Sequence, residues 1–271
     1  MAFSIFSRPP RVALLRLSGL IAARTSSFGA PGISAATTGP LIDRAFALKR
    51  LAGVVLVINS PGGSPVQSSL VGAQIRRLAD EKKVPVIACV EDAAASGGYW
   101  LACAADEIVV DASSIVGSIG VISAGFGLED AIGRIGIVRR LHTAGEQKSF
   151  LDPFGPERPE DVARLRGLLG QLHGTFQDWV RLRRGLRLRA PEAELFTGRF
   201  WAGAKAVELG LADKLGDAAT EIKARFGEKA QVVRIGAPRP PWPLRLLSGA
   251  ALADGAMAVV EERAAWARLG L

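Results

Sequence analysis

The sequence predicts an α/β protein with a mainly parallel sheet, and three observations support this prediction. Short, continuous apolar runs such as 54–58 and 84–90 have the length and composition of strands that are buried on both faces. Between them lie longer segments, such as 66–81, in which apolar residues recur near helical spacing. The two kinds of segment alternate, as they do where crossover helices join parallel strands. With 271 residues, the chain can form one such domain and a tail.

Each expected element follows from its local pattern. Short apolar runs predict strands at 12–17, 54–58, 84–90, 108–110, 116–122, 137–142 and 232–235. Helical spacing and flanking Gly or Pro predict helices at 41–49, 66–81, 99–104, 159–183 and 202–209, the last closed by Gly210.

The Pro-rich stretch 238–243 breaks this alternation and predicts a linker. Residues 1–237 would then form the main domain, and residues 238–271 a linker with an Ala-rich helical tail. We expect the tail to dock on its own domain or on a neighbouring subunit, with peripheral contact to a membrane as the alternative.

Composition limits the possible partners and compartments. The net charge is +8, but the densest basic run, 181–189, alternates with Leu and has no interleaved aromatic residues, which favours a solvated helix end over a nucleic-acid surface. Cys89 and Cys103 lie in apolar surroundings and are expected to be buried thiols rather than a disulfide or a metal site.

The sequence shows no membrane anchor. No apolar stretch approaches the roughly 20 residues of a spanning helix, and the N-terminal residues lack the apolar region of a signal peptide. We therefore expect a cytoplasmic protein, at most peripheral to the inner face of the cell membrane.

Two Gly-rich turns, 59–64 and 93–98, each follow a buried strand and precede a helix. Ligands of open α/β sheets bind at this edge, where free backbone N–H groups can hold an anion. Neither turn carries a dinucleotide or phosphate-binding motif. The turns therefore suit an anion formed during reaction, such as the oxyanion of acyl transfer, and we expect neither a cofactor nor a metal.

Ser96 is the candidate nucleophile, although a serine at this position can also be a simple helix N-cap. A serine nucleophile needs a base. The two histidines, His142 and His173, are poorly placed for this role, and a desolvated lysine can replace histidine. Lys148 is the best placed lysine, because it follows an expected strand and has apolar neighbours such as Phe150.

Several motifs occur along the chain in a fixed order. They are Asn59-Ser60-Pro61-Gly62-Gly63, Ala94-Ala95-Ser96-Gly97-Gly98-Tyr99, Val116-Gly117-Ser118-Ile119-Gly120-Val121, Lys148-Ser149, Thr197-Gly198-Arg199 and Gly210-Leu211-Ala212-Asp213. Together they resemble the signal peptide peptidase A (protease IV) family of serine peptidases. The similarity extends from about residue 12 to 216 and is specific because the motifs occur in the family's order.

This resemblance implies a Clp-protease/crotonase-like fold and a Ser–Lys dyad. By position, Ser96 would be the nucleophile and Lys148 the general base. Ser118 would orient the lysine amine, and the N–H groups of Gly63 and Gly97 would form the oxyanion hole.

The resemblance also implies a function and an assembly. The expected activity is that of a serine endopeptidase on short, unfolded, largely apolar peptides such as signal-peptide remnants. In the family, the serine and lysine of one site come from adjacent domains, so a chain with one domain copy would need a homo-oligomeric ring. The alternatives are a crotonase-type enzyme acting on acyl-CoA thioesters and a non-catalytic binding or scaffold protein. We expect peptide substrates and no nucleic acid as partners.

Overall fold

The computed structural model describes residues 9–23, 32–145, 147–236, 260 and 262–271. They fall into two compact units, which we call unit 1 (Met1–Ile119 with Gln177–Leu271) and unit 2 (Gly120–Phe176). The strands are β1 (Arg11–Ser18), β2 (Leu51–Ser60), β3 (Val86–Ala95), β4 (Glu107–Val110), β5 (Ile115–Gly117), β6 (Phe200–Ala202), β7 (Lys214–Leu215) and β8 (Gln231–Ile235). The helices are α1 (Ala35–Phe46), α2 (Pro65–Lys82), α3 (Gly97–Ala102), α4 (Glu129–Arg134), α5 (Pro159–Arg184), α6 (Glu192–Leu195), α7 (Gly203–Glu208) and α8 (Ala218–Phe226), with a 3-10 turn at Gly185–Arg187.

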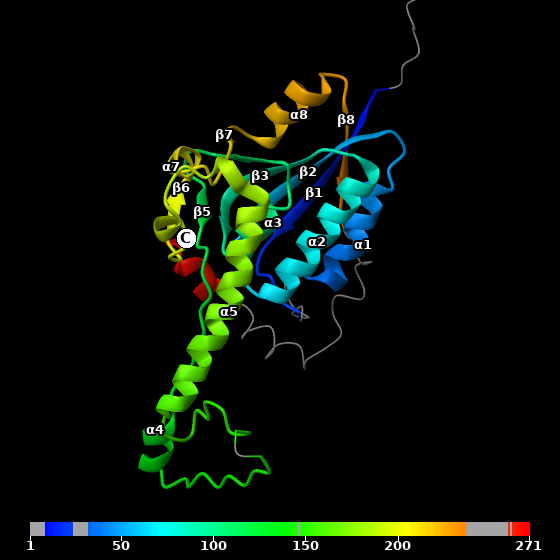
Figure 1. Ribbon diagram of the computed structural model, residues 1–271. Helices are drawn as coiled ribbons and strands as arrows, with labels where there is room; N and C mark the ends of the chain where they lie inside the picture. Colours follow the sequence, from blue (N-terminus) through cyan, green and yellow to red (C-terminus); the bar gives the residue numbers. More distant parts are fainter. Residues whose placement is uncertain (1–8, 24–31, 146, 237–259, 261) are drawn as a thin grey trace, which may run out of the picture. The chain divides into compact units, whose positions relative to one another are not determined.

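Unit 1 is built on one sheet, in which the described strands follow the order β6-β5-β3-β2-β1-β8 (Figure 1). All neighbours in this order are parallel except β5 and β6, which are antiparallel. The first half of β3 pairs with β4, which in turn pairs with β7. Because β1, β2 and β3 are parallel, their carboxyl ends meet at one edge of the sheet.

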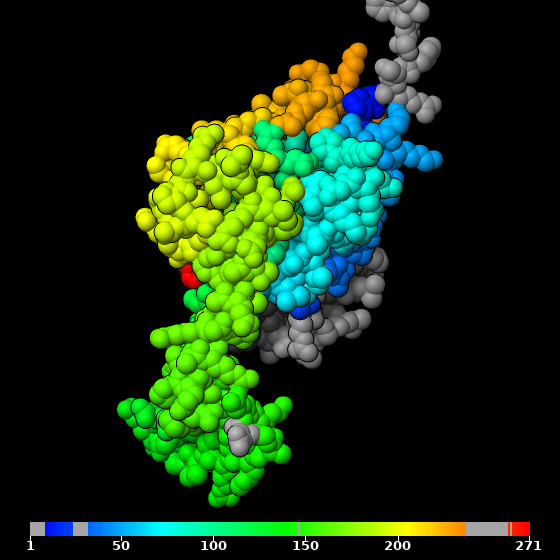
Figure 2. Space-filling view, in the orientation of Figure 1, coloured from blue at the N-terminus to red at the C-terminus, as the bar shows by residue number. Residues whose placement is uncertain are grey.

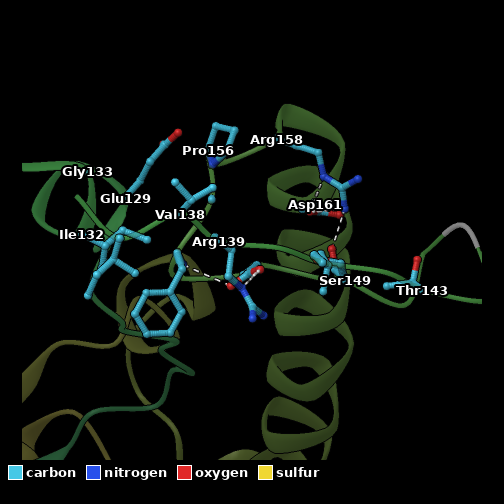
Figure 3. Close-up of a pocket in the computed structure, with 15 residues that line it drawn as sticks. Glu129, Ile132, Gly133, Val138, Arg139, Thr143, Ser149, Pro156, Arg158 and Asp161 are labelled. Carbon is cyan, nitrogen blue, oxygen red and sulfur yellow. Dashed lines mark hydrogen bonds and ion pairs between the residues drawn. The ribbon is translucent and has the colours of Figure 1, made fainter. Parts of the chain in front are cut away.

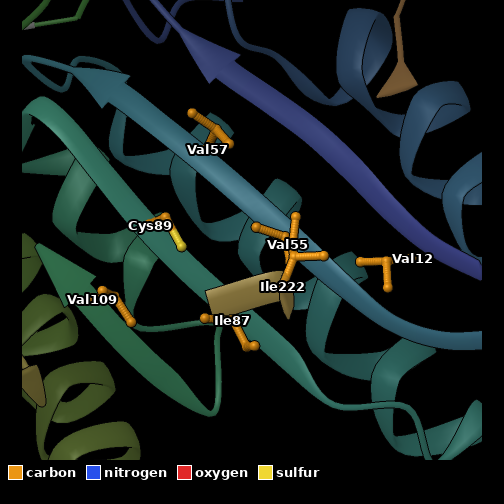
Figure 4. Packing of buried hydrophobic residues seen from close by; sticks show 7 residues of the cluster. All are labelled: Val12, Val55, Val57, Ile87, Cys89, Val109 and Ile222. Atoms are coloured by element: carbon orange, nitrogen blue, oxygen red, sulfur yellow. The ribbon is translucent and has the colours of Figure 1, made fainter. Parts of the chain in front are cut away.

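Both faces of this sheet are covered. On one face, α1 and α2 pack side by side and hide the strands behind them (Figures 1 and 2). On the other face, Ile222 of α8 packs into an apolar cluster formed by alternate strand residues (Figure 4). Coverage of both faces explains why the strands are continuous apolar runs. The strand members of the cluster are Val12, Val55, Val57, Ile87, Cys89 and Val109.

β3 changes partner from β4 to β5 where it approaches its carboxyl end. At this change, the buried hydroxyl of Ser114 donates to the carbonyl of Glu91 at 2.6 Å. On the other side of β3, where the register with β2 shifts, the Asn59 side chain donates to Asp92 at 2.6 Å and accepts from the Ala93 N–H at 3.2 Å. These side chains satisfy backbone groups that the interrupted ladder leaves unpaired.

The last turns of α5 lie in unit 1 and hold α3. The indole N–H of Trp179 donates to the Trp100 carbonyl at 3.0 Å, and the two rings stack with centroids 5.9 Å apart. Arg183 donates to the carbonyls of Cys103 and Ala105, just beyond the end of α3. A cationic side chain at this position satisfies carbonyls that the short helix leaves free.

Arg184, which belongs to the basic run 181–189, is only 3% exposed. Its guanidinium donates to the Gly210 carbonyl and forms a two-pronged ion pair with Asp213, at 2.8 and 3.0 Å. The expectation that the run 181–189 is a solvated helix end is therefore wrong for Arg184, whose charge is satisfied in the interior.

Unit 2 consists of α4, the first part of α5 and irregular segments before and between these helices. Its contacts include the ion pair between Arg139 and Asp152 at 3.1 Å. Large apolar side chains remain on its surface, with Phe126 87% and Val138 76% exposed. In the part of the chain that the structure describes, no helix is long and apolar enough to cross a membrane.

The C-terminal residues return to the sheet of unit 1. Residues 262–267 are helical, and Leu269 is buried against Ala93 and Ala95 of β3, with Trp266 packed beside it. The described end of the tail thus docks on its own domain. The predicted linker 238–243 and most of the tail lie outside the described residues.

Most predicted elements are confirmed, with shifted bounds. α1 begins at Ala35, earlier than the expected 41, and β3 extends to Ala95, through residues expected to form a turn. The predicted strand 137–142 is wrong: these residues form no strand and are exposed. The short elements β6, β7, α4 and α6, and the helix α8, were not expected from the sequence.

The buried pair of Arg184 and Asp213 makes a testable contribution to stability. Burial alone disfavours the charged carboxylate, but hydrogen bonds from Arg184 and from the Ile108 N–H hold the pKa of Asp213 below its ordinary value. This contribution is present above the unfolded-state pKa of about 4. It is lost as the pH falls through the lower folded-state pKa.

We expect Arg184→Met to lower the free energy of unfolding near pH 7 by about 3 kcal/mol, because it removes the two-pronged partner of a largely buried carboxylate. Asp213 then keeps only the Ile108 N–H and the more distant guanidinium of Arg187, 3.7 Å away. The deficit relative to the unmutated protein should shrink toward acid pH, since Asp213 without its partner is protonated more readily. Denaturant unfolding at several pH values measures both effects. The control is Arg77→Met, which removes an exposed pair with Glu81 and should cost less than about 0.5 kcal/mol. Equal losses in the two variants would contradict the assignment.

Candidate functional site

Ser96 lies in the tight turn between β3 and α3. Its backbone adopts φ +50° and ψ −119°, a conformation that L-residues rarely adopt, and its N–H donates to the Gly117 carbonyl at 2.8 Å. Although Ser96 occupies the N-cap position of α3, its side chain makes no capping hydrogen bond. The hydroxyl has no hydrogen-bond partner among the described residues. The N-cap interpretation therefore does not account for this serine.

The second Gly-rich turn connects β2 to α2. The buried hydroxyl of Ser60 donates to the Gly19 carbonyl at 2.7 Å and accepts from the Gly62 N–H at 3.2 Å. Gly62 and Gly63 have φ values of +104° and +140°, which favour glycine at both positions. Gly63 is exposed at the surface of the turn.

The two turns approach each other so closely that side chains would not fit between them. A Cβ atom on Gly62 would lie 2.8 Å from the Cβ of Ser96 and 2.9 Å from the N atom of Gly97. A Cβ atom on Gly97 would lie 3.4 Å from the N atom of Gly63. Neither the Gly63 N–H nor the Gly97 N–H donates to any described residue. Two free N–H groups beside a free hydroxyl form a geometry suited to an oxyanion in acyl transfer.

Ser118 is half-buried and directly follows the residue that accepts from Ser96. It also has a positive φ of +54°, and its N–H donates to the Arg199 carbonyl at 2.7 Å. Arg199 belongs to the Thr197-Gly198-Arg199 motif, so this motif fixes the segment that carries Ser118. Unit 1 thus brings together four of the five candidate residues: Ser96, Gly63, Gly97 and Ser118.

The fifth candidate, Lys148, belongs to unit 2 and is exposed. It lies in a non-helical segment whose backbone turns back on itself, with the Lys148 N–H donating to the Gly145 carbonyl at 3.2 Å. His142 is also exposed in unit 2, and His173 lies on the part of α5 in unit 2. Unit 1, as described, therefore holds the nucleophile candidate without either histidine.

Unit 2 also contains a cavity of about 610 Å³ next to the lysine segment (Figure 3). Ser149 lines it together with two ion pairs, Arg139–Asp152 and Arg158–Asp161. The remaining wall is largely apolar and includes Ile132, Ile137, Val138, Leu141 and Phe154.

Three further residues support the site, and the sequence analysis assigned no role to any of them. Ile21 pairs by its backbone with the Gly62–Ser64 turn, at 2.8 and 2.7 Å, and a Cβ atom on Gly97 would lie 3.0 Å from its Cδ1 atom. Ser60 ties the same turn to Gly19, directly after β1. Ser68 on α2 is fully buried, and its hydroxyl donates to the Ser64 carbonyl at 2.9 Å. Ser60 lies within a motif that the sequence analysis quoted, whereas no spacing pattern singles out Ile21 or Ser68.

The ionisable groups of the core are not reactive. Burial raises the pKa of both Cys89 and Cys103 to about 12, so both thiols are protonated at neutral pH. They are free and buried, which confirms the expectation for them. Within the described ranges, no group of three or more His, Cys, Asp or Glu residues is positioned to share a metal ion.

Sequence comparisons identify similar proteins. The family model described as peptidase family S49 matches residues 78–232. A Brucella melitensis biotype 1 protein named Na(+)/H(+) antiporter NhaA is 44% identical over 274 residues, which cover 96% of this chain and 37% of that protein. The chloroplastic serine protease SPPA of Arabidopsis thaliana is 31% identical over 249 residues, covering 88% of this chain and 36% of the relative. The chain thus spans little more than a third of the length of these two relatives.

Among solved structures, a mutant of the 1510-N membrane-bound stomatin-specific protease is similar, with a TM-score of 0.52. The alignment covers 86% of this chain and 100% of the other, at 14% sequence identity. This likeness concerns the fold alone. It confirms the expected Clp-protease/crotonase-like architecture.

The positive φ of Ser96 predicts that the fold would be more stable with glycine at this position. We expect Ser96→Gly to exceed Ser96→Ala in free energy of unfolding by about 1 kcal/mol, because glycine adopts this conformation without steric cost. Alanine is the matched control, since both variants lack the hydroxyl. Urea unfolding measures the difference, and a Ser96→Gly variant no more stable than Ser96→Ala would show that the turn is unstrained.

Proposed function

The chain belongs to peptidase family S49, and from this premise we propose that it is a serine endopeptidase with a Ser–Lys dyad. Ser96 is the nucleophile and Lys148 the general base. The substrates are short, unfolded, largely apolar peptides, such as remnants of signal peptides. No cofactor takes part in the proposed reaction.

The observation that carries this proposal is the uncapped Ser96 hydroxyl beside the free N–H groups of Gly63 and Gly97. In the proposed reaction, the hydroxyl oxygen attacks the peptide carbonyl carbon while its proton passes to the Lys148 amine. The carbonyl oxygen becomes an oxyanion that accepts from the two N–H groups. The C–N bond then breaks, Lys148 returns the proton to the leaving amine, and water hydrolyses the acyl-enzyme.

Ser118 is proposed to orient the base. Its segment is fixed to unit 1 by the bond to the Arg199 carbonyl, and it adjoins the residue that accepts from Ser96. A hydroxyl at this position can accept a hydrogen bond from the lysine ammonium or donate one to the neutral amine. This role accounts for a half-buried serine in a motif otherwise made of glycine and β-branched residues.

The preference for extended, apolar peptides is supported by the surroundings of the oxyanion turn. Gly63 is exposed, and Val66 on the first turn of α2 is 60% exposed, with Leu70 exposed one turn further on. Apolar side chains beside the scissile bond favour apolar substrate residues. An extended peptide can also place its backbone directly against the turn. In a folded protein, the surrounding side chains would keep the backbone away from the turn.

A ring of identical subunits is the proposed assembly. Ser96 and Lys148 lie in different units, so the dyad can be completed by the lysine of a second copy. Unit 2 exposes large apolar side chains, including Phe126 and Val138, of the kind that contacts between subunits bury. In a closed ring of this kind, each interface joins two unlike surfaces.

A fluorophosphonate probe tests the nucleophile and the base together. We expect it to modify Ser96 covalently in the unmutated protein, with mass spectrometry locating the adduct. Lys148→Arg should react as slowly as Lys148→Ala, because a guanidinium does not lose its proton near neutral pH and cannot act as a base. Labelling elsewhere, or Lys148→Arg within about tenfold of the unmutated rate, would refute the dyad. No labelling at all would favour a crotonase-type or non-catalytic protein.

Complementation tests whether the dyad is shared between copies. Chains with Ser96→Ala and chains with Lys148→Ala are each expected to be inactive. When they are co-expressed in equal amounts, about a quarter of the sites should regain activity, because random mixing pairs an intact Ser96 with an intact Lys148 at that frequency. Failure in verified mixed oligomers would show that each chain completes its own dyad.

A further inference from the structure

Lys148 lies in a short segment that the beginning of α5 holds on both sides of the lysine. We infer that Arg158, Asp161 and Arg164 are positioning residues, which fix the backbone around Lys148 and so aim its amine at the reacting serine. This inference rests on the proposed role of Lys148 as general base. All of the contacts that support it lie within unit 2.

Arg164 binds the residues on either side of the lysine. Its guanidinium donates to the side-chain oxygen of Gln147 at 2.8 Å, one position before Lys148. The same guanidinium lies over the ring of Phe150, 5.2 Å from the ring centroid and two positions after Lys148. One arginine therefore contacts the segment at two points, by a hydrogen bond to Gln147 and by a cation–π contact with Phe150.

Arg158 and Asp161 hold the segment immediately after the lysine. Arg158 donates to the Ser149 carbonyl at 2.6 Å and to the Asp161 carboxylate at 2.8 and 2.9 Å (Figure 3). Asp161 also accepts from the Leu151 N–H at 3.5 Å. Asp161 is only 8% exposed, so its charge is compensated largely by Arg158 and by the first turn of α5.

The backbone of the segment needs this support. Leu151 has a φ of +48°, a left-handed conformation that is unfavourable for a branched side chain. Such a conformation persists where the surroundings hold it, and here the N–H of Leu151 faces the buried carboxylate of Asp161. The direction of the segment is thus set by α5 rather than by its own preference.

The Lys148 side chain takes no part in these contacts. They are made by Gln147, Ser149, Phe150 and Leu151. The Lys148 side chain is exposed and has no hydrogen bond or ion pair with any described residue. A lysine anchored only through its backbone neighbours keeps its amine available for a proton from another residue. Fixing the backbone also lowers the number of conformations in which the amine lies too far from the Ser96 hydroxyl to accept its proton.

Arg164→Met provides the main test, because Arg164 is exposed on a helix and its replacement does not open the core. We expect kcat and the rate of fluorophosphonate labelling of Ser96 to fall by about ten- to a hundredfold, with KM changed less than about twofold. Arg164→Lys keeps a cation for Phe150 and a donor for Gln147, and should recover most of the loss. Arg166→Met is the matched control on the same helix, since no described contact joins Arg166 to the lysine segment, and it should behave as the unmutated protein.

Asp161→Asn removes the buried charge while keeping its shape, and should lower kcat in the same way. Thermal unfolding and sedimentation are measured for every variant, so that loss of fold or assembly is separated from misplacement of the lysine. Normal kcat and labelling in Arg164→Met, in a protein that Lys148→Ala inactivates, would overturn the inference and leave the proposed function standing. An active Lys148→Ala variant would instead refute the proposed function. A loss in Arg166→Met equal to that in Arg164→Met would also overturn the inference.

Discussion

The close approach of two backbone turns at the carboxyl edge of the sheet is the constraint on which the rest of the structure depends. Gly62, in the turn after β2, has no room for a Cβ atom because Ser96, directly after β3, lies too close. The parallel pairing of β2 and β3 brings these strand ends together, and Ser60 near the end of β2 pairs with Ala94 near the end of β3. The positive φ of Ser96 and the free N–H groups of Gly63 and Gly97 are consequences of this packing.

Many contacts in unit 1 hold these two turns close together. Ile21 and Ser60 hold the turn between β2 and α2 from the side of β1. Ser114 satisfies backbone groups where β3 changes partner from β4 to β5, and Asn59 does so where the register between β2 and β3 shifts. α3 is only six residues long, and its far end is held by Arg183 and Trp179 of α5. A short helix has little stability of its own, so these tertiary contacts keep it in place.

The sequence predicted the sheet of unit 1 well, because burial on both faces leaves a strong signal in the strands. It also predicted the two turns, since a Gly-rich segment directly after a buried strand is typical of a tight turn at the edge of a sheet. The failures have physical causes. Ile137, Val138 and Leu141 resemble a strand, but a strand needs a neighbour to pair with, and none of the described segments of unit 2 provides one. The burial of Arg184 depends on Asp213, which is distant in sequence and gives no local signal.

The site was predictable in part for the same reason. Ser96, Gly63, Gly97 and Ser118 lie at strand ends, where topology brings them together, and the structure places all four in unit 1. The placement of Lys148 relative to them does not follow from strand order, because it belongs to an irregular segment of unit 2. The contacts of Arg158 and Arg164 around that segment connect residues in loops and on a helix face, and no periodic pattern encodes them.

Each residue of the proposed dyad is held in place by contacts within its own unit. This has a consequence for the proposed assembly. The turn of Ser96 is held by contacts within unit 1, and the segment of Lys148 by contacts within unit 2. If the proposed ring forms, the conformational entropy of each half is therefore lost during folding and not when subunits meet. In the proposed ring, binding between copies would then have only to align two preformed halves, and burial of exposed side chains such as Phe126 and Val138 would supply the driving force. In the proposed assembly, a single chain would be inactive, and activity would arise only when copies of the chain meet.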